Sequence, residues 1–238
     1  MLSAEAGQGS RRALVFGGTG AVGNAVLRAL ARRGVETIFT YHRQGDRAKA
    51  LAAELGQRAE AVDLADEASI KALFAQLHAE DRSPDLFFHG AATLGEGPED
   101  WDHTMAVNAR SAFLACRALC APMAARGGGD IVLVGALDRG QSLPLPPAFA
   151  ASQGALGALA MAMAKELGPR KIRVNLAVSG LLDAGLSRGL SAALREDYLA
   201  LSALRRLGRP EEVARVLVWL GLDNHYLSGK IVPVSGGI

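Results

Sequence analysis

Short β-branched and apolar runs alternate with longer Ala- and Leu-rich stretches along the chain, and this alternation limits the possible fold more than any other feature. Each short run suits one strand and each longer stretch, such as 21–33 or 66–79, suits one helix. Strands that alternate with helices form parallel, doubly wound sheets whose two faces are both covered by helices. We therefore predict an α/β fold with seven parallel strands, at 13–16, 36–40, 59–62, 85–88, 130–134, 172–176 and 231–234.

The length of the chain, 238 residues, fits one α/β domain, and half of the residues are hydrophobic. No repeat or linker divides it, so we expect a flexible N-terminal tail at 1–11 and a single domain at 12–238. Residues 1–12 contain an acid and two glycines but no continuous apolar stretch, which argues against a signal peptide or membrane anchor. No uncharged apolar run reaches the ~18 residues of a spanning helix. We expect a cytoplasmic protein that does not bind membranes.

Charge and cysteine content exclude several kinds of partner. The formal net charge is +2 and the basic residues are interspersed with acids, so we do not expect a nucleic-acid partner. Cys116 and Cys120 lie four residues apart on a predicted helix, where small buried hydrophobic residues are the usual interpretation. A zinc site normally needs four ligands, and no further ligands stand at a suitable spacing, so we predict no metal.

A glycine-rich segment follows the first predicted strand and opens a helix, which is the context of a dinucleotide-binding turn in a Rossmann-type fold. Its first glycine permits a tight turn, the small residues permit close approach to a pyrophosphate, and the last glycine permits helix packing near the positive helix end. An ordinary strand-to-helix turn remains the alternative. The segment consists of Gly17, Gly18, Thr19, Gly20, Ala21, Val22 and Gly23.

The end of the second strand bears on the choice of cofactor. An NAD site normally has an acid about twenty residues beyond the glycine turn, to bind the ribose hydroxyls. This chain instead has His42 and Arg43, and a guanidinium suits a 2′-phosphate. The sequence favours NADP over NAD, unless Arg43 is simply a solvated turn residue.

Several further motifs carry a resemblance that runs from end to end of the chain. The sequence resembles the short-chain dehydrogenase/reductase family, and most closely its ketoacyl-reductase-like branch. In that family Asp63 would contact the adenine ring, and Leu64 and Gly90 would also lie against the cofactor. The motifs are Gly17 to Gly23, Asp63-Leu64, Asn108, 149–153, 173–175, 208–214, 226–229 and 234–237.

The resemblance also implies where catalysis would occur. The family uses a Ser, a Tyr, a Lys four residues after that Tyr, and a helical Asn. Asn108 matches the helical Asn, whereas Ala136, Phe149 and Gln153 fall on the Ser, Tyr and Lys positions. Two flanking segments also depart from the family: His89-Gly90-Ala91-Ala92 replaces Asn-Asn-Ala-Gly, and Ser179-Gly180 with Ala184 replaces Pro-Gly and a downstream Thr.

These replacements remove proton handling. Hydride addition to a carbonyl leaves an alkoxide, so an acid must deliver a proton. Phe149 has no proton to donate, Ala136 cannot hold a carbonyl oxygen, and Gln153 carries no charge to lower a phenol pKa, although it can still hold a ribose hydroxyl. We therefore expect negligible carbonyl reduction.

Three functions remain open. The first is a partner or scaffold subunit that pairs through helices at 109–125 and 149–167, as a homodimer, a homotetramer or a complex with an active homologue. The second is a repurposed enzyme, a dehydratase, cyclase or isomerase for a ketide-like or aromatic molecule. The third is residual NADP(H)-dependent ketoreduction with His89 or water as the donor. Polar candidates for chemistry are His89, Asp138, Arg139, Gln141, Ser152, Gln153 and Asp183.

Overall fold

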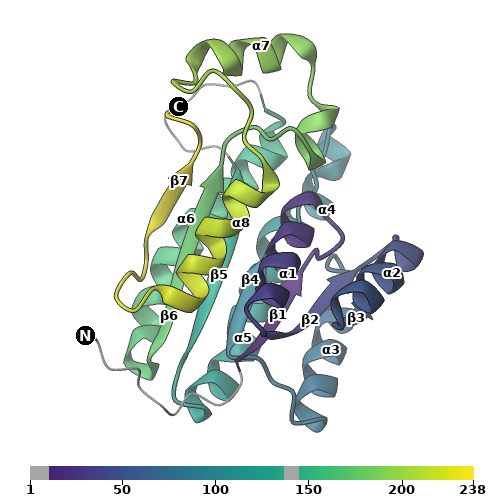
Figure 1. Cartoon of the computed structure of the whole chain (residues 1–238), viewed down its shortest axis with the longest axis vertical. Coiled ribbons are helices and arrows are strands. Elements are labelled where there is room, and N and C mark those ends of the chain that lie inside the picture. Colours follow the sequence, from purple (N-terminus) through teal and green to yellow (C-terminus); the bar gives the residue numbers. More distant parts are fainter. Residues whose placement is uncertain (1–10, 137–144) are drawn as a thin grey trace.

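The computed structural model describes residues 11–136 and 145–238 and shows one seven-stranded sheet (Figure 1). The strand order is β3-β2-β1-β4-β5-β6-β7, and every neighbouring pair is parallel. The predicted fold and all seven strands are therefore confirmed. The strands are β1 (Arg12–Phe16), β2 (Glu36–Tyr41), β3 (Arg58–Ala61), β4 (Leu86–His89), β5 (Gly129–Ala136), β6 (Ile172–Ser179) and β7 (Ile231–Val234).

Helices connect the strands and cover both faces of the sheet. Two π-helical turns occur in the described residues, η2 between α4 and α5 and η5 directly after α8. The main helices are α1 (Ala21–Arg32), α2 (Gly45–Leu55), α3 (Glu67–Ala79), α4 (Trp101–Met105), η2 (Ala106–Arg110), α5 (Ser111–Ala125), α6 (Pro147–Leu167), α7 (Ala192–Leu201) and α8 (Pro210–Val218). The short helical segments are η1 (Pro98–Asp100), η3 (Gly168–Arg170), η4 (Gly185–Gly189) and η5 (Trp219–Asp223).

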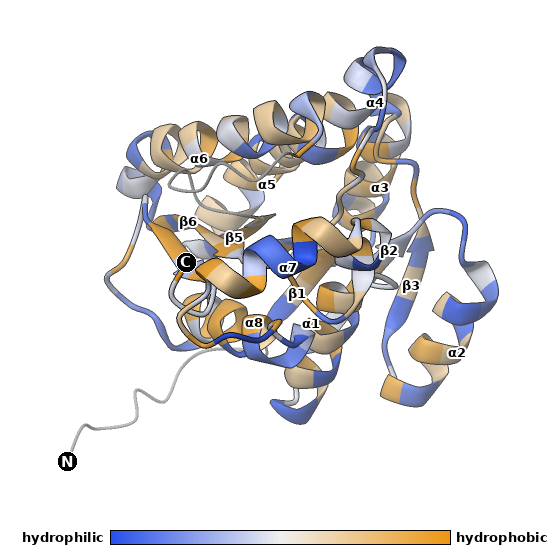
Figure 2. Ribbon diagram, turned by 90° about the horizontal axis from the view of Figure 1, so that it is seen from above, coloured by the Kyte–Doolittle hydropathy of each residue, from blue (hydrophilic) through white to orange (hydrophobic). Residues whose placement is uncertain are grey.

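The core consists of two layers of side chains, one on each face of the sheet. Successive residues of a strand point to opposite faces, so Phe87 belongs to the layer under α3, α5 and α6, whereas Phe88 belongs to the layer under α1, α2 and α8. The view from above shows the two groups of helices separated by the sheet (Figure 2). These two layers hold the strand ends at fixed positions.

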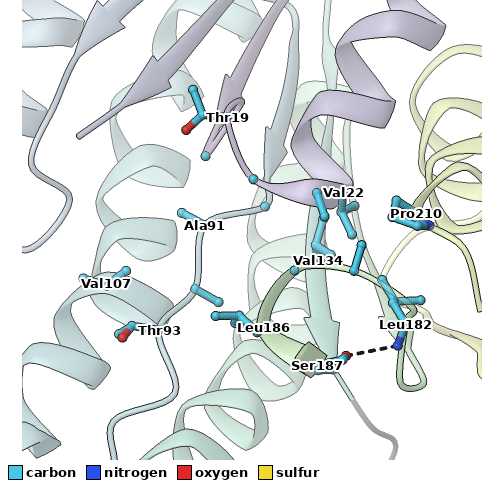
Figure 3. Close-up of a pocket in the computed structure, with 18 of the residues that line it drawn as sticks. Thr19, Val22, Ala91, Thr93, Val107, Val134, Leu182, Leu186, Ser187 and Pro210 are labelled. Atoms are coloured by element: carbon cyan, nitrogen blue, oxygen red, sulfur yellow. Dashed lines mark hydrogen bonds between the residues drawn. The ribbon is translucent and has the colours of Figure 1, made fainter. Parts of the chain in front are cut away.

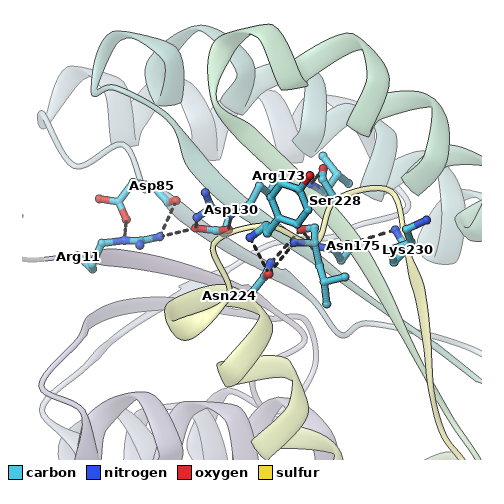
Figure 4. Close-up of polar contacts among 11 residues, drawn as sticks. Arg11, Asp85, Asp130, Arg173, Asn175, Asn224, Ser228 and Lys230 are labelled. Carbon is cyan, nitrogen blue, oxygen red and sulfur yellow. Dashed lines mark hydrogen bonds and ion pairs between the residues drawn. The ribbon is translucent and has the colours of Figure 1, made fainter. Parts of the chain in front are cut away.

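Arg11 and an ion-pair network occupy the end of the sheet at which the parallel strands begin (Figure 4). Arg11 Nε lies 2.6 Å from Asp85 Oδ1, and its Nη2 lies 3.0 Å from Asp130 Oδ2. Arg173 makes two further bonds to Asp130, at 2.7 and 2.8 Å. Arg11, assigned to the expected tail, is thus tied to Asp85, which directly precedes β4, and to Asp130 on β5, while residues 1–10 lie outside the described part of the chain.

Helix α6 is rich in apolar residues. Within the described residues, the stretch Pro147–Arg170 has the length and hydropathy that a membrane-crossing helix would need. Its inner side nevertheless supplies Leu156, Met163 and Leu167 to the core over β5 and β6. Packing on the sheet accounts for that apolar composition.

Candidate functional site

A cavity of about 810 Å³ opens at the carboxyl ends of the strands (Figure 3). The strand order diverges between β1 and β4, and ligands of doubly wound sheets bind at such a point. Gly17, which follows β1, and Gly90, which follows β4, both line the cavity. The segment η4 borders it from the side of β6, where the Leu182 N–H donates to Ser187 Oγ at 3.0 Å.

The glycine-rich turn forms one wall of the cavity. Gly17 adopts φ +77°, and its N–H donates to Thr40 Oγ1 at 3.2 Å. A Cβ on Gly23 would lie 2.2 Å from the Gly17 carbonyl oxygen, so the predicted packing role of Gly23 agrees with the structure. Thr19, Ala21 and Val22 line the cavity.

Gly18 has a different role from the one expected. It does not belong to the cavity lining, and a Cβ there would lie 2.5 Å from the ring of Phe39 on β2. The absence of a side chain at Gly18 therefore permits packing between the turn and β2, rather than approach to a ligand. Sequence reasoning missed this because the contact is between segments distant in the chain.

The β2 side of the cavity carries polar groups. His42, Arg43, Asp63 and Leu64, which we expected to contact a cofactor, all line it. His42 Nδ1 lies 3.7 Å from Asp63 Oδ1, and both side chains are partly exposed. Asp63 Oδ1 also accepts a bond from the Ala65 N–H at 2.9 Å, which fixes the carboxylate at the cavity edge. We call this part the nucleotide half.

Ala136, Phe149 and Gln153 meet in the other part of the cavity, which we call the reaction half. Gln153 Oε1 accepts a hydrogen bond from the Ala136 backbone N–H at 3.0 Å, and Gln153 Nε2 donates to Ser152 Oγ at 3.2 Å. The Phe149 side chain is buried against the same wall. The resemblance thus selected three positions that are adjacent in space, and none of these residue types has an ionisable group.

Asn108 matches the family motif but does not line the cavity. It is fully buried, and its Oδ1 accepts from the Thr93 N–H at 2.8 Å. Its Nδ2 donates to the Thr93 carbonyl and to Ser152 Oγ, both at 2.9 Å. Both amide hydrogens are used, so Asn108 joins the loop after β4 to α6 and is not placed to contact a ligand.

His89 is likewise not where a catalytic group is required. It is fully buried and outside the cavity lining, with Nε2 2.6 Å from Ser111 Oγ. Burial lowers the pKa of His89 to about 4. The expected proton donor therefore lies behind the cavity wall as a neutral ring.

The remaining polar candidates differ in position. Ser152 is buried and donates to the Phe149 carbonyl at 2.7 Å, while Asp183 is exposed and outside the cavity lining. Asp138, Arg139 and Gln141 lie outside the described residues. Ser179, Gly180 and Ala184, which the resemblance marked as departures from the family pattern, line the cavity.

Two polar residues, His103 and Arg188, are among the lining residues that sequence reasoning did not propose. His103 is exposed on α4 and shares a cavity-facing side with Val107, four residues later. Arg188 on η4 lines the cavity, and its Nε donates to the Asp183 carbonyl at 3.2 Å. The i,i+4 spacing of His103 and Val107 was the available signal for His103, whereas Arg188 stands in the short segment η4, where no such pattern occurs.

Comparison with known proteins agrees with this architecture. The family model described as "Enoyl-(Acyl carrier protein) reductase" matches residues 18–238. A human relative named "3-oxoacyl-[acyl-carrier-protein] reductase" is 30% identical over 238 residues, covering 94% of this chain and 96% of the relative. An Escherichia coli relative named "Cyclic-di-GMP-binding biofilm dispersal mediator protein" is 30% identical over 230 residues and covers 94% of each chain.

A solved structure extends the likeness to three dimensions. A short-chain dehydrogenase/reductase from Serratia marcescens superposes with a TM-score of 0.84 at 29% identity, covering 95% of this chain and 97% of the other. The family match, the sheet order and the cavity at its switch point agree with one another. The chain belongs to the short-chain dehydrogenase/reductase family.

Proposed function

We propose that this chain binds an NADP-class dinucleotide but does not perform the carbonyl reduction of its family, and that it acts as a ligand-binding or partner subunit. The observation that carries the proposal is the Gln153–Ala136 hydrogen bond beside buried Phe149. It supports the assignment of these three residues to the positions where the family places its Lys, Ser and Tyr. The residues there can pack and accept hydrogen bonds, but they cannot donate a proton to an alkoxide.

The size of the expected loss follows from the missing groups. Loss of general acid catalysis typically removes about 10²–10⁴ in rate, and loss of an oxyanion donor removes a comparable factor. The two factors do not multiply fully, since the groups act as a unit. Residual reduction with His89 as the donor is not favoured, because that ring is buried away from the cavity.

The nucleotide half supports dinucleotide binding. The Gly17 turn and the N-terminus of α1 offer backbone N–H groups to a pyrophosphate. Arg43 lines the cavity beside His42 and supplies the charge that a 2′-phosphate would pair with. When bound, an NADP-class cofactor would supply the hydride in ordinary members of the family.

The reaction half suits an apolar ligand of ketide-like or aromatic type. Its walls are mostly aliphatic and aromatic, which is the usual lining of small-molecule sites. The E. coli relative is named for binding a ligand rather than for a reduction, which shows that a role described by binding occurs among similar chains. The apolar lining residues are Val107, Val134, Leu145, Phe149, Leu181, Leu186 and Leu190.

The outer faces of α5 and α6 support a partner role. Phe113 and Met161 are 45% and 43% exposed. Alanines and Gly154 also face outward along α6, and small residues let helices approach closely. We propose association with a second copy or with an active homologue through this face. Size measurement with and without a co-expressed homologue tests it, and a monomer under both conditions would contradict it.

One observation favours a second candidate function, namely non-redox chemistry such as dehydration, cyclisation or isomerisation. His103 lines the cavity, and imidazole is the readiest acid–base group near neutral pH. Product analysis with ketide-like thioesters, comparing the wild type with His103→Ala, tests this candidate. A product that both proteins form at the same rate would exclude His103.

Calorimetric titration with NADPH and NADH tests the main proposal. We expect saturable NADPH binding with a micromolar Kd and weaker NADH binding. The absence of binding heat and of competition with either dinucleotide would contradict the proposal that this chain binds an NADP-class dinucleotide. Binding of both with equal affinity would retain the cavity assignment but contradict the preference that we assign to Arg43.

A further inference from the structure

His89 poses a packing problem that its surroundings do not explain. It ends β4 with none of its surface exposed, and its ring centroid lies 5.9 Å from that of Phe16 and 6.3 Å from that of Phe87. A phenyl ring would fill such a space without burying polar nitrogens. An imidazole at this point therefore calls for a reason beyond filling volume.

The hydrogen bonds around His89 fix its tautomer. Ser111 Oγ donates to the Val107 carbonyl at 2.6 Å, and a serine hydroxyl has a single hydrogen. The 2.6 Å contact between Ser111 Oγ and His89 Nε2 consequently requires the hydrogen to be on Nε2. His89 Nδ1 is then unprotonated, and the described residues offer it no partner.

Ser111 connects this ring to the irregular turn η2. In a regular α-helix the Val107 carbonyl would accept from the backbone N–H of Ser111. In this π-helical turn it accepts from the Ser111 hydroxyl instead. Such turns are rare and often lie at functional sites. Here the turn carries Val107, which lines the cavity, and Asn108, which holds the Thr93 loop.

We propose that His89, as the neutral Nε2–H tautomer, is a positioning residue that holds Ser111 against the Val107 carbonyl and so maintains the π-helical turn behind the cavity wall. The ring acts through Ser111 and touches no ligand. Its low pKa, caused by burial, keeps it neutral at physiological pH, in agreement with this role. The consequence for ligand binding, though not the tautomer itself, rests on the proposed function.

The first test measures the tautomer in the wild type. Protein labelled with ¹⁵N at its five histidines gives ring nitrogen signals, and His89 is assigned as the set missing from His89→Phe. We expect a protonated Nε2 and an unprotonated Nδ1 at pH 7, with Ser111→Ala changing the signals of this ring. A protonated Nδ1 would overturn the proposal. The tautomer is measured on the wild type, so the test does not require His89→Phe to fold. If that variant fails to fold, the signals that change in Ser111→Ala provide the assignment.

The second test measures how firmly the turn is held. Loss of one buried hydrogen bond should speed hydrogen exchange in η2 and at Ser111 and Ala112 roughly tenfold in His89→Phe. Ser111→Ala should do the same, and the double variant should add little to either change. Phe88→Leu, a buried control on the opposite face of the sheet, should leave these amides unchanged. Equal exchange in all variants, or equal acceleration in the control, would overturn the proposal.

The third test concerns the cavity and uses NADPH as the probe. We expect His89→Phe and Ser111→Ala to weaken NADPH binding severalfold and the Phe88→Leu control to bind as the wild type does. Unchanged affinity in both variants, with a wild type that binds, would contradict the link to the cavity. A wild type that does not bind NADPH would defeat the proposed function instead, while the tautomer and exchange results would still decide the role of His89.

Discussion

The nucleotide half and the reaction half of the cavity carry different kinds of side chain, although one sheet supports both. The nucleotide half has a glycine turn with φ +77° at Gly17 and the polar residues His42, Arg43 and Asp63. The reaction half has Phe149 and Gln153 beside Ala136, with the Gln153 amide bonded to backbone and to Ser152. His42, Arg43 and Asp63 line the first half, whereas the Gln153 amide of the second half is hydrogen-bonded into the cavity wall.

Under the proposed function, this difference separates cofactor binding from proton transfer within one fold. The nucleotide half is built from the loops after β1, β2 and β3, whereas Ala136, Phe149 and Gln153 of the reaction half come from the end of β5 and from α6. Substitutions on α6 therefore need not disturb the glycine turn. In the account proposed above, the first half still binds and the second no longer reacts.

The largest expected effect comes from restoring the reaction half. The combined substitutions Ala136→Ser, Phe149→Tyr and Gln153→Lys should raise NADPH-dependent ketone reduction by about 10² or more over the wild type, since they return the proton donor and its neighbours. The assay is NADPH absorbance with a ketoacyl thioester. Phe149→Tyr alone is the control and should gain much less. A triple variant that folds, binds NADPH and stays inactive would contradict the claim that these three positions account for the difference between the two halves.

Acid should weaken the fold behind the reaction half. The pKa of His89 is about 4 in the folded protein, lowered by burial from its ordinary 6.5. The unfolded chain takes up the proton as pH falls through 6.5, while the folded ring does so only near 4. Stability is therefore fully present above pH 6.5 and falls by about 3 kcal/mol as pH approaches 4.

Urea unfolding between pH 7.5 and 4 measures this loss. His89→Phe should lose less stability than the wild type over the same interval, by nearly the amount assigned to this ring. Parallel curves for the two proteins would show that other groups cause the acid sensitivity.

Asn108 should prove structural. Asn108→Ala leaves both backbone groups of Thr93 and the hydroxyl of Ser152 without this partner. Leaving buried groups unsatisfied should cost about 2 kcal/mol and lower Tm by roughly 4–8 °C. Thermal unfolding measures it, with exposed Asp183→Ala as a control that should leave Tm nearly unchanged. An unchanged Tm for Asn108→Ala would contradict a structural role and would again make Asn108 a candidate ligand contact.

The smallest expected effect concerns the nucleotide half. Arg43→Ala should weaken NADPH binding roughly tenfold, as expected for one charge-assisted contact to a phosphate, and should leave NADH binding unchanged. Competitive titration of the two dinucleotides measures the ratio. Arg188→Ala, at the other part of the cavity, serves as the matched arginine control. An equal loss for NADPH and NADH would show that Arg43 does not contact a 2′-phosphate.

The fold could be predicted from the sequence far better than the roles of buried polar residues. Strand and helix patterns are local, and the predicted segment 231–234 coincides with β7 (Ile231–Val234). The direction in which a polar side chain points is set by packing between segments that are distant in the chain. The sequence placed His89 and Asn108 correctly near the cavity, yet both side chains are buried in the protein and neither lines the cavity.

The same reason explains the mixed result for the glycine turn. Gly23 is required by a contact within the turn itself, because an added Cβ would meet the Gly17 carbonyl oxygen, and sequence spacing reveals such a local contact. A Cβ on Gly17 would instead meet Ala91, which follows β4 and is distant in the chain. Gly18 is required by the ring of Phe39 from the next strand, which only the folded chain brings near. Likewise the Gln153–Ala136 bond joins α6 to β5, and no spacing rule predicts it.

The most direct test of the central claim is one experiment on the wild type. The protein is saturated with NADPH, as judged by calorimetry, and NADPH absorbance is then followed with ketoacyl thioesters and quinones. We predict full occupancy without consumption of the cofactor over many hours. Stoichiometric or catalytic oxidation of NADPH with formation of the alcohol or hydroquinone would contradict the account.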